Sequence, residues 1–134
     1  MRVVIDANVL IAAYASRGLC EATVELCIIN DHIILTEDII GDLAEKLTKK
    51  IKLPTARVAA ITAYLKNNSH LVRSAHVPLE ACRDPDDLNI LGAALAGKAE
   101  YIISGDDDLL SLGAYEGIPI VSPRQYWELF TRTE

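Results

Sequence analysis

Short hydrophobic runs recur along the chain, and each ends at a polar residue or at glycine. Runs of this kind, rich in valine and isoleucine, are typical of strands buried in a parallel sheet. We predict five strands, at residues 2–5, 31–35, 70–73, 101–104 and 118–121. The third is the weakest of these patterns, and Pro119 in the fifth indicates the edge of the sheet.

Apolar residues at helical spacing separate the predicted strands. Thr36 can cap the helix after the second strand. Pro54 can open the next helix, which ends near Asn67, because proline lacks the amide hydrogen that the first turn leaves unpaired. Asp84 followed by Pro85 has the form of another helix start. The apolar stripe of the helix after Thr36 consists of Ile39, Ile40, Leu43, Leu47 and Ile51. Further helices are predicted after residue 6, at about 19–30, within 106–112 and after residue 123.

Strands and helices that alternate in this order predict right-handed crossovers and an α/β fold of three layers, α/β/α, around a central parallel sheet of about five strands. The chain has 134 residues, 51% of them hydrophobic, and shows no linker or internal repeat. We therefore expect a single domain over residues 1–134. The apolar start of the chain includes Asp6 and Asn8, so we expect no signal peptide or membrane span, and the cytoplasm as the compartment.

Five acidic residues lie at or near the ends of predicted strands, at the edge where an open parallel sheet forms its ligand crevice. They are Asp6, Asp84, Asp87, Asp106 and Asp108. The net charge of −6 argues against binding nucleic acid by bulk electrostatics. Of 19 acidic and 13 basic residues, setting aside these five acids and Asp42 leaves 13 of each, so the candidate site can hold the whole excess.

Most of these acids also have a structural explanation. Asp84 and Asp106 can cap helices, and Asp87 can stabilise the first turn of its helix through the macrodipole. Asp6 is the exception, because it follows an apolar strand at a depth where an unpaired carboxylate is costly. Asn8, two residues on, can orient it or bind a metal-coordinated water.

Converging carboxylates need a cation. Two of them about 4 Å apart repel by roughly 4 kcal/mol at an effective dielectric constant near 20. The three histidines show no HxH or HxxxH spacing, so ligation by oxygen alone favours Mg²⁺ or Mn²⁺ over Zn²⁺. Such an ion suits phosphate chemistry, and the pattern indicates hydrolysis of a phosphodiester.

Three segments that together span nearly the whole chain resemble one known family. They are VVIDANVLIAA, DPDDLNILGAALAGKAEYIISGDDDLLSL and GIPIVSPRQYWELF. The chain resembles the PIN-domain family of ribonucleases, and within it the VapC-like toxin components of toxin–antitoxin pairs. The resemblance implies an endoribonuclease that depends on Mg²⁺ or Mn²⁺ and acts on RNA. It also implies an antitoxin protein as partner and a homodimer as a common assembly.

The resemblance assigns the site residue by residue. Its catalytic and metal-binding acids are Asp6, Asp87 and Asp106, supported by Asn8 and Ser104. The family's second acid is usually glutamate, and here IIGDLAEKL puts the shorter Asp42 at that position. Glu45 is the alternative, but on a helical wheel it lies nearly opposite the apolar stripe, whereas Asp42 lies closer to its edge. Asp84 and Asp108 are secondary candidates, for a second ion or for water-mediated contacts.

One basic cluster lies close to Asp42 in the sequence and could hold a phosphate backbone, although a solvated helix face explains it equally well. It consists of Lys46, Lys49, Lys50, Lys52 and Arg57. Two other functions stay open. The Asp42 substitution is compatible with a non-catalytic PIN-like module that binds RNA or protein. A Rossmann-like phosphatase is disfavoured, because Asp6-Ala-Asn8 departs from a DxD pattern and no lysine follows the fourth or fifth strand.

Overall fold

A single sheet organises the fold. The structure, a computed structural model, describes residues 1–16 and 18–131. Within these residues six strands pair in the order β3-β2-β1-β4-β6-β5. The strands are β1 (Arg2–Ile5), β2 (His32–Leu35), β3 (Ser69–Leu71), β4 (Tyr101–Ile103), β5 (Ala114–Tyr115) and β6 (Ile118–Val121). Every pairing is parallel except the one between β5 and β6.

The five predicted strands are all present, with ends displaced by at most two residues. The sixth, β5, was not predicted. It has two residues and forms a hairpin with β6, and Glu116 and Gly117 at the turn both have positive φ. The expectation that Pro119 marks the outermost strand was wrong, because Pro119 pairs with Ala114 of β5. A two-residue strand is too short to give a periodic signal, which is why the sequence pattern missed it.

The predicted helices are also present. They are α1 (Ala7–Ala15), α2 (Leu19–Asn30), α3 (Glu37–Lys49), α4 (Thr55–Asn67), α5 (Pro85–Gly97), α6 (Asp107–Leu112) and α7 (Pro123–Thr131), with a 3-10 turn η1 at Leu79–Ala81. The Thr36 hydroxyl caps α3 by accepting the amide of Ile39. Asp84 caps α5 with Pro85 at its first position, as predicted. In the described part of the chain, no helix has the length and apolar character that crossing a bilayer requires.

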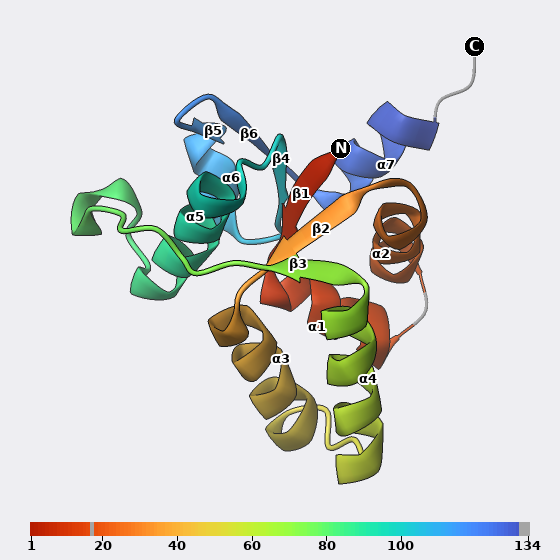
Figure 1. Cartoon of the computed structure of the whole chain (residues 1–134). Coiled ribbons are helices and arrows are strands. Elements are labelled where there is room, and N and C mark those ends of the chain that lie inside the picture. The colour runs from red at the N-terminus through yellow and green to blue at the C-terminus, as the bar shows by residue number, and fades with distance from the viewer. Residues whose placement is uncertain (17, 132–134) are drawn as a thin grey trace.

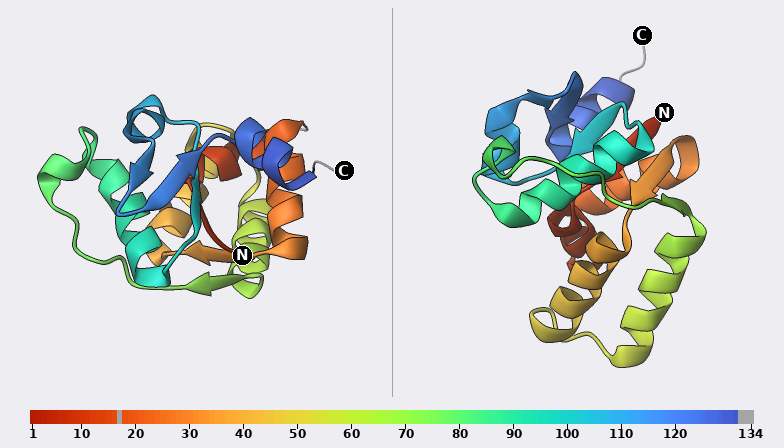
Figure 2. Two further views of the ribbon diagram at one scale, coloured as in Figure 1. Left: turned by 90° about the horizontal axis from the view of Figure 1, so that it is seen from above. Right: turned by 60° about the vertical axis from the view of Figure 1, so that its left-hand side comes forward.

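Helices cover both faces of the sheet, which confirms the three-layer α/β/α fold. Helix α5 packs on β1, β2 and β4, whereas α2 packs on β2 and α7 packs on β6. Figure 1 and the left view of Figure 2 place α5 on one side of the sheet and α2 with α7 on the other. Helices α3 and α4 pack on each other, with α4 also against β3, and the right view of Figure 2 shows this pair projecting beyond the sheet.

Close packing fixes α5, the helix that begins with Asp84 and carries Asp87. A Cβ added to Gly97 would lie 2.4 Å from Cγ2 of Ile34, so only glycine allows α5 to approach the sheet this closely. Gly92 meets the segment after β3 in the same way, and its carbonyl accepts the amide of Ala75 at 3.0 Å. These contacts hold the first turn of α5 beside the carboxyl ends of β1 and β4.

Candidate metal centre

Asp6 sits at the carboxyl end of β1, where the chain turns into α1. Its amide donates to the carbonyl of Ile103 in β4, and its Oδ1 accepts the amide of Asn8 at 3.3 Å, which caps α1. Its Oδ2 accepts the hydroxyl of Ser104 at 2.7 Å. The residue is 5% exposed. The buried carboxylate expected from the sequence is therefore present and held by two donors.

Ser104 connects the ends of β1 and β4. It is fully buried, and its hydroxyl both donates to Asp6 and accepts the amide of Asp106 at 2.9 Å. Asp106 caps α6 by accepting the amide of Asp108 at 2.7 Å. A hydroxyl can donate and accept at once, so one small side chain fixes two carboxylates from separate strands.

Asp87 completes a group of three. It lies in the first turn of α5, is 5% exposed, and accepts the thiol of Cys82 at 3.7 Å. One carboxylate oxygen from each of Asp6, Asp87 and Asp106 lies within 4.8 Å of the other two. Asp87 and Asp106 lie 81 and 100 positions after Asp6 in the sequence, so distant segments converge here, as the strand-end rule predicts.

The negative charges of the three carboxylates are not balanced by neighbouring positive charges among the described residues, and the pKa values show the effect. Burial, reinforced by the charge of Asp106, raises the pKa of Asp87 to about 7. Burial also raises the pKa of Asp6, against the opposing effect of hydrogen bonds from Ser104 and Asn8. A protonated Asp87 can donate to Asp106, which further favours the neutral form. A bound divalent cation would reverse this preference.

The residues present fit such an ion. The carboxylates face a cavity of about 180 Å³, which leaves room for coordinated waters beside an ion. Mg²⁺ and Mn²⁺ prefer oxygen ligands, and Mg²⁺ commonly retains several waters. The lining includes Asp6, Asn8, Asp42, Lys46, Asp84, Asp87 and Asp106.

Asp42 lines the cavity from α3 but stands outside the group of three. Its side chain is 46% exposed and pairs with Lys46 at 3.3 Å. Glu45 does not line the cavity, so of the two alternatives for the second acid only Asp42 faces the site. Lys46 also lines it, and its positive charge lowers the pKa of Asp6.

The two secondary acids differ in position. Asp84 lines the cavity while its Oδ1 accepts the amide of Asp86 as the helix cap. Asp108 is outside the lining, and its Oδ1 accepts from Arg83 at 2.8 Å, in an ion pair that joins the start of α5 to α6. The sequence did not single out this pair, because its members are 25 residues apart and nothing local links them.

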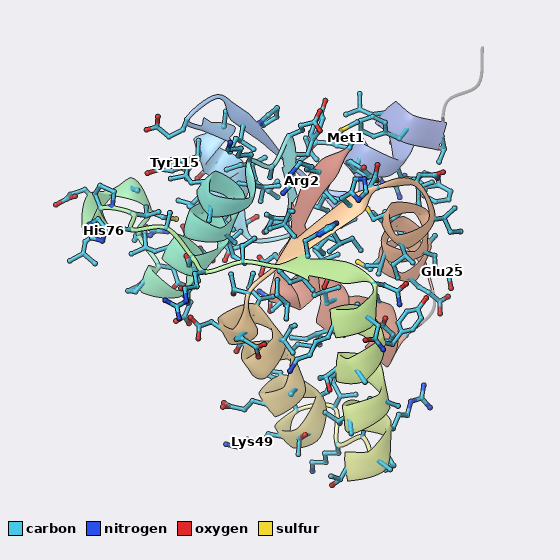
Figure 3. The ribbon with its side chains drawn as sticks, viewed as in Figure 1. Met1, Arg2, Glu25, Lys49, His76 and Tyr115 are labelled. Atoms are coloured by element: carbon cyan, nitrogen blue, oxygen red, sulfur yellow. The ribbon has the colours of Figure 1, made fainter. Side chains whose placement is uncertain are left out.

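Sequence reasoning also missed three polar residues of the cavity lining: Asp38, Asp86 and Asn89. Asp38 could have been found, because it lies in the first turn of α3, directly after β2, at the same edge as the other acids. The predicted basic cluster is not gathered at the cavity. Lys46 lines it, whereas Lys49, Lys50 and Arg57 do not. Figure 3 shows Lys49 at the end of α3 farthest from the sheet.

Comparisons with known proteins agree with this architecture. A family model described as PIN domain matches residues 2–108. No curated protein sequence matches the chain. Among solved structures, a chain of VapBC2 from Rickettsia felis, bound to a DNA fragment from the VapBC2 promoter, superposes with a TM-score of 0.64 and 12% sequence identity. The match covers 91% of this chain and 98% of that one, and at this identity it shows the fold alone.

Proposed function

Because the chain belongs to the PIN domain family, we propose that it is a nuclease that hydrolyses RNA phosphodiester bonds with a carboxylate-bound Mg²⁺ or Mn²⁺. The observation that carries the proposal is the buried group of Asp6, Asp87 and Asp106, whose oxygens lie within 4.8 Å of one another. Burying three neighbouring carboxylates costs folding free energy unless a cation neutralises them. Their oxygens are the ligands that bind the Mg²⁺ of phosphoryl-transfer enzymes.

Asp6, Asp87 and Asp106 would hold the ion. When bound, it supplies positive charge to the phosphate and lowers the pKa of a coordinated water, which yields a nucleophile near neutral pH. Ser104 keeps Asp6 and Asp106 in one orientation through its two hydrogen bonds. We assign it a positioning role, since its hydroxyl is already used by these two partners.

Residues around this core complete the proposed site. Asp42, Asp84 and Asn8 face the cavity and can accept hydrogen bonds from coordinated waters. Lys46 faces it as well and is the lysine placed to contact a phosphate oxygen beside the ion. Lys49, Lys50 and Arg57 lie outside the cavity lining, so they can contact RNA only at a distance from the cleaved bond. Asp108 forms an ion pair with Arg83 and has no part in the proposed metal site.

We also propose an antitoxin protein as partner, a homodimer as the assembly and the cytoplasm as the compartment. Support for the partner comes from the resemblance to toxin components and from the solved neighbour, which is a VapBC2 complex. The continuous hydrophobic core supports a single domain over residues 1–134.

One alternative function has an observation in its favour. Asp42 is half-exposed and already paired with Lys46, which suits a PIN-like module that binds RNA without cutting it.

Incubation of the pure protein with labelled RNA, with and without Mg²⁺ or Mn²⁺, separates these functions. Cleavage should require the ion and should be lost in Asp6→Asn and in Asp106→Asn. The matched control is Asp107→Asn, since Asp107 is exposed next to Asp106 and is absent from the cavity lining. Cleavage that survives in both site variants, or RNA left intact in all conditions, would overturn the proposal. Turnover of a small phosphomonoester instead would indicate the phosphatase.

A further inference from the structure

Two histidines face each other across neighbouring strands, away from the acidic cavity. His32 begins β2 and His70 is the middle residue of β3. His70 is the partner of Ile34, two residues after His32, so alternation along a strand puts both rings on one face of the sheet. Nδ1 of His32 lies 3.3 Å from Nε2 of His70, with the ring centroids 5.3 Å apart. Both residues are exposed.

This nitrogen separation is the one that a shared metal ion requires. Imidazole nitrogens bind Zn²⁺ at about 2.0–2.1 Å, so two of them at tetrahedral or right angles lie roughly 2.9–3.4 Å apart. The same separation also allows a hydrogen bond between the rings, with a proton near the line that joins the two nitrogens. Neither ring nitrogen has another hydrogen-bond partner among the described residues.

We propose that His32 and His70 form a binding site for a late first-row transition-metal ion, with Zn²⁺, Ni²⁺ and Cu²⁺ as its class. Imidazole prefers these ions, whereas Mg²⁺ prefers the oxygen ligands of the acidic cavity. In the described part of the chain, Asp6, Asp87 and Asp106 form the sole group of three or more His, Cys, Asp or Glu side chains that could hold an ion together. Water would therefore fill the remaining coordination positions of an ion bound by the two histidines.

The two sites are separate in space. His32 pairs with Arg2 at the start of β1, and Asp6 lies four residues further, about 13 Å along the strand. The ion would act on the sheet edge. Strand β3 has three residues and is paired on one side only, with β2. An ion coordinated by one histidine from each strand would therefore cross-link β3 to β2 and stabilise the folded chain by mass action.

Calorimetric titration of the full chain with Zn²⁺, in excess Mg²⁺ to occupy the acidic cavity, tests the site. We expect one Zn²⁺ per chain and a higher melting temperature, with affinity falling at least about tenfold in His32→Gln and in His70→Gln because each leaves a single imidazole. His76→Gln is the matched control, since His76 is exposed on the segment that Figure 3 shows extending beyond α5.

A variant of the acidic cavity distinguishes Zn²⁺ binding at the histidines from metal binding at the proposed nuclease site. Zn²⁺ affinity should be unchanged in Asp106→Asn, which removes a proposed ligand of the other ion. Binding that is lost in Asp106→Asn but kept in both histidine variants would overturn the inference. So would the absence of Zn²⁺ binding, or an equal loss in His76→Gln, which would indicate unspecific coordination.

Discussion

Replacing Asp87 with asparagine should stabilise the metal-free protein, although it removes a proposed metal ligand. Asparagine has nearly the same shape and keeps an oxygen that can accept from the Cys82 thiol. What changes is the charge. Asp87 is 5% exposed and has the carboxylates of Asp6 and Asp106 as neighbours. The substitution therefore relieves the cost of burying a charge and the repulsion by Asp6 and Asp106, both of which are present only while Asp87 is ionised.

The magnitude follows from the raised pKa of Asp87 and, for the repulsive part alone, from Coulomb's law. The pKa of Asp87 is raised from 3.8 to about 7, and roughly three units at about 1.4 kcal/mol each correspond to about 4 kcal/mol for the ionised group. Two charges separated by the 4.8 Å limit of this cluster repel by about 3.5 kcal/mol at an effective dielectric constant near 20. Asparagine loses a favourable charge in the first turn of α5, which costs about 0.3–1 kcal/mol. We expect a net gain of about 2–4 kcal/mol.

The pH dependence carries a definite sign. Because the pKa of Asp87 is higher in the folded protein, the folded state keeps a proton that the unfolded chain releases between about pH 4 and 7. The free energy of unfolding of the wild type should therefore decrease as the pH rises through this window. In Asp87→Asn this decrease should be reduced.

Urea unfolding in EDTA at about pH 5 and pH 8, followed by the fluorescence of Trp127, measures both effects. Replacing the EDTA with Mg²⁺ should raise the stability of the wild type at the higher pH and leave that of Asp87→Asn nearly unchanged. Asp107→Asn, an exposed position in the first turn of α6, should stay within about 0.5 kcal/mol of the wild type. The reasoning is refuted if Asp87→Asn is no more stable than the wild type at pH 8, or if its gain is equal at both pH values.

Three further outcomes are expected. Ser104→Ala should lower the free energy of unfolding by about 1–3 kcal/mol, because it removes a buried donor from Asp6, and should reduce RNA cleavage more than a stability-matched core variant does. Asp42→Glu should cleave RNA at least as fast as the wild type in a time course, because the longer side chain matches the usual family residue and reaches further into the cavity from α3; slower cleavage would contradict this. Gly92→Ala should destabilise by about 1–3 kcal/mol in urea unfolding, because its Cβ would lie 2.4 Å from a backbone oxygen, whereas Gly41→Ala, in open space on α3, should stabilise by about 0.5–1 kcal/mol.

Much of the fold was predictable because each long strand is a buried, β-branched run. Val3, Val4 and Ile5 of β1 are fully buried, and a continuous apolar segment is what burial on both faces requires. The rule that parallel strands end at one edge was enough to bring Asp6 and Asp106 together. Strand β5 escaped prediction because two residues carry no period.

Side-chain partners were less predictable than backbone positions. The sequence treated five basic residues near Asp42 alike, yet only Lys46 of them lines the cavity. That distinction depends on the phase of α3 against the sheet, which tertiary packing sets. In the same way, Asp106 and Asp108 are two residues apart, but one faces Asp6 while the other pairs with Arg83. The direction in which each side chain points at the start of α6 decides which of the two faces the cavity. No local sequence pattern encodes that direction.

The acidic cavity links substrate binding to the stability of the fold. Its lining carries seven aspartates and two asparagines for a single lysine, Lys46, so without an added cation its carboxylates would repel an RNA phosphate as well as one another. A divalent ion held by Asp6, Asp87 and Asp106 would relieve both kinds of repulsion at once. RNA affinity and folding stability should therefore rise over the same range of Mg²⁺ concentration. A surface lysine patch would behave differently, because its affinity for RNA would fall as salt rises and would leave stability unaffected.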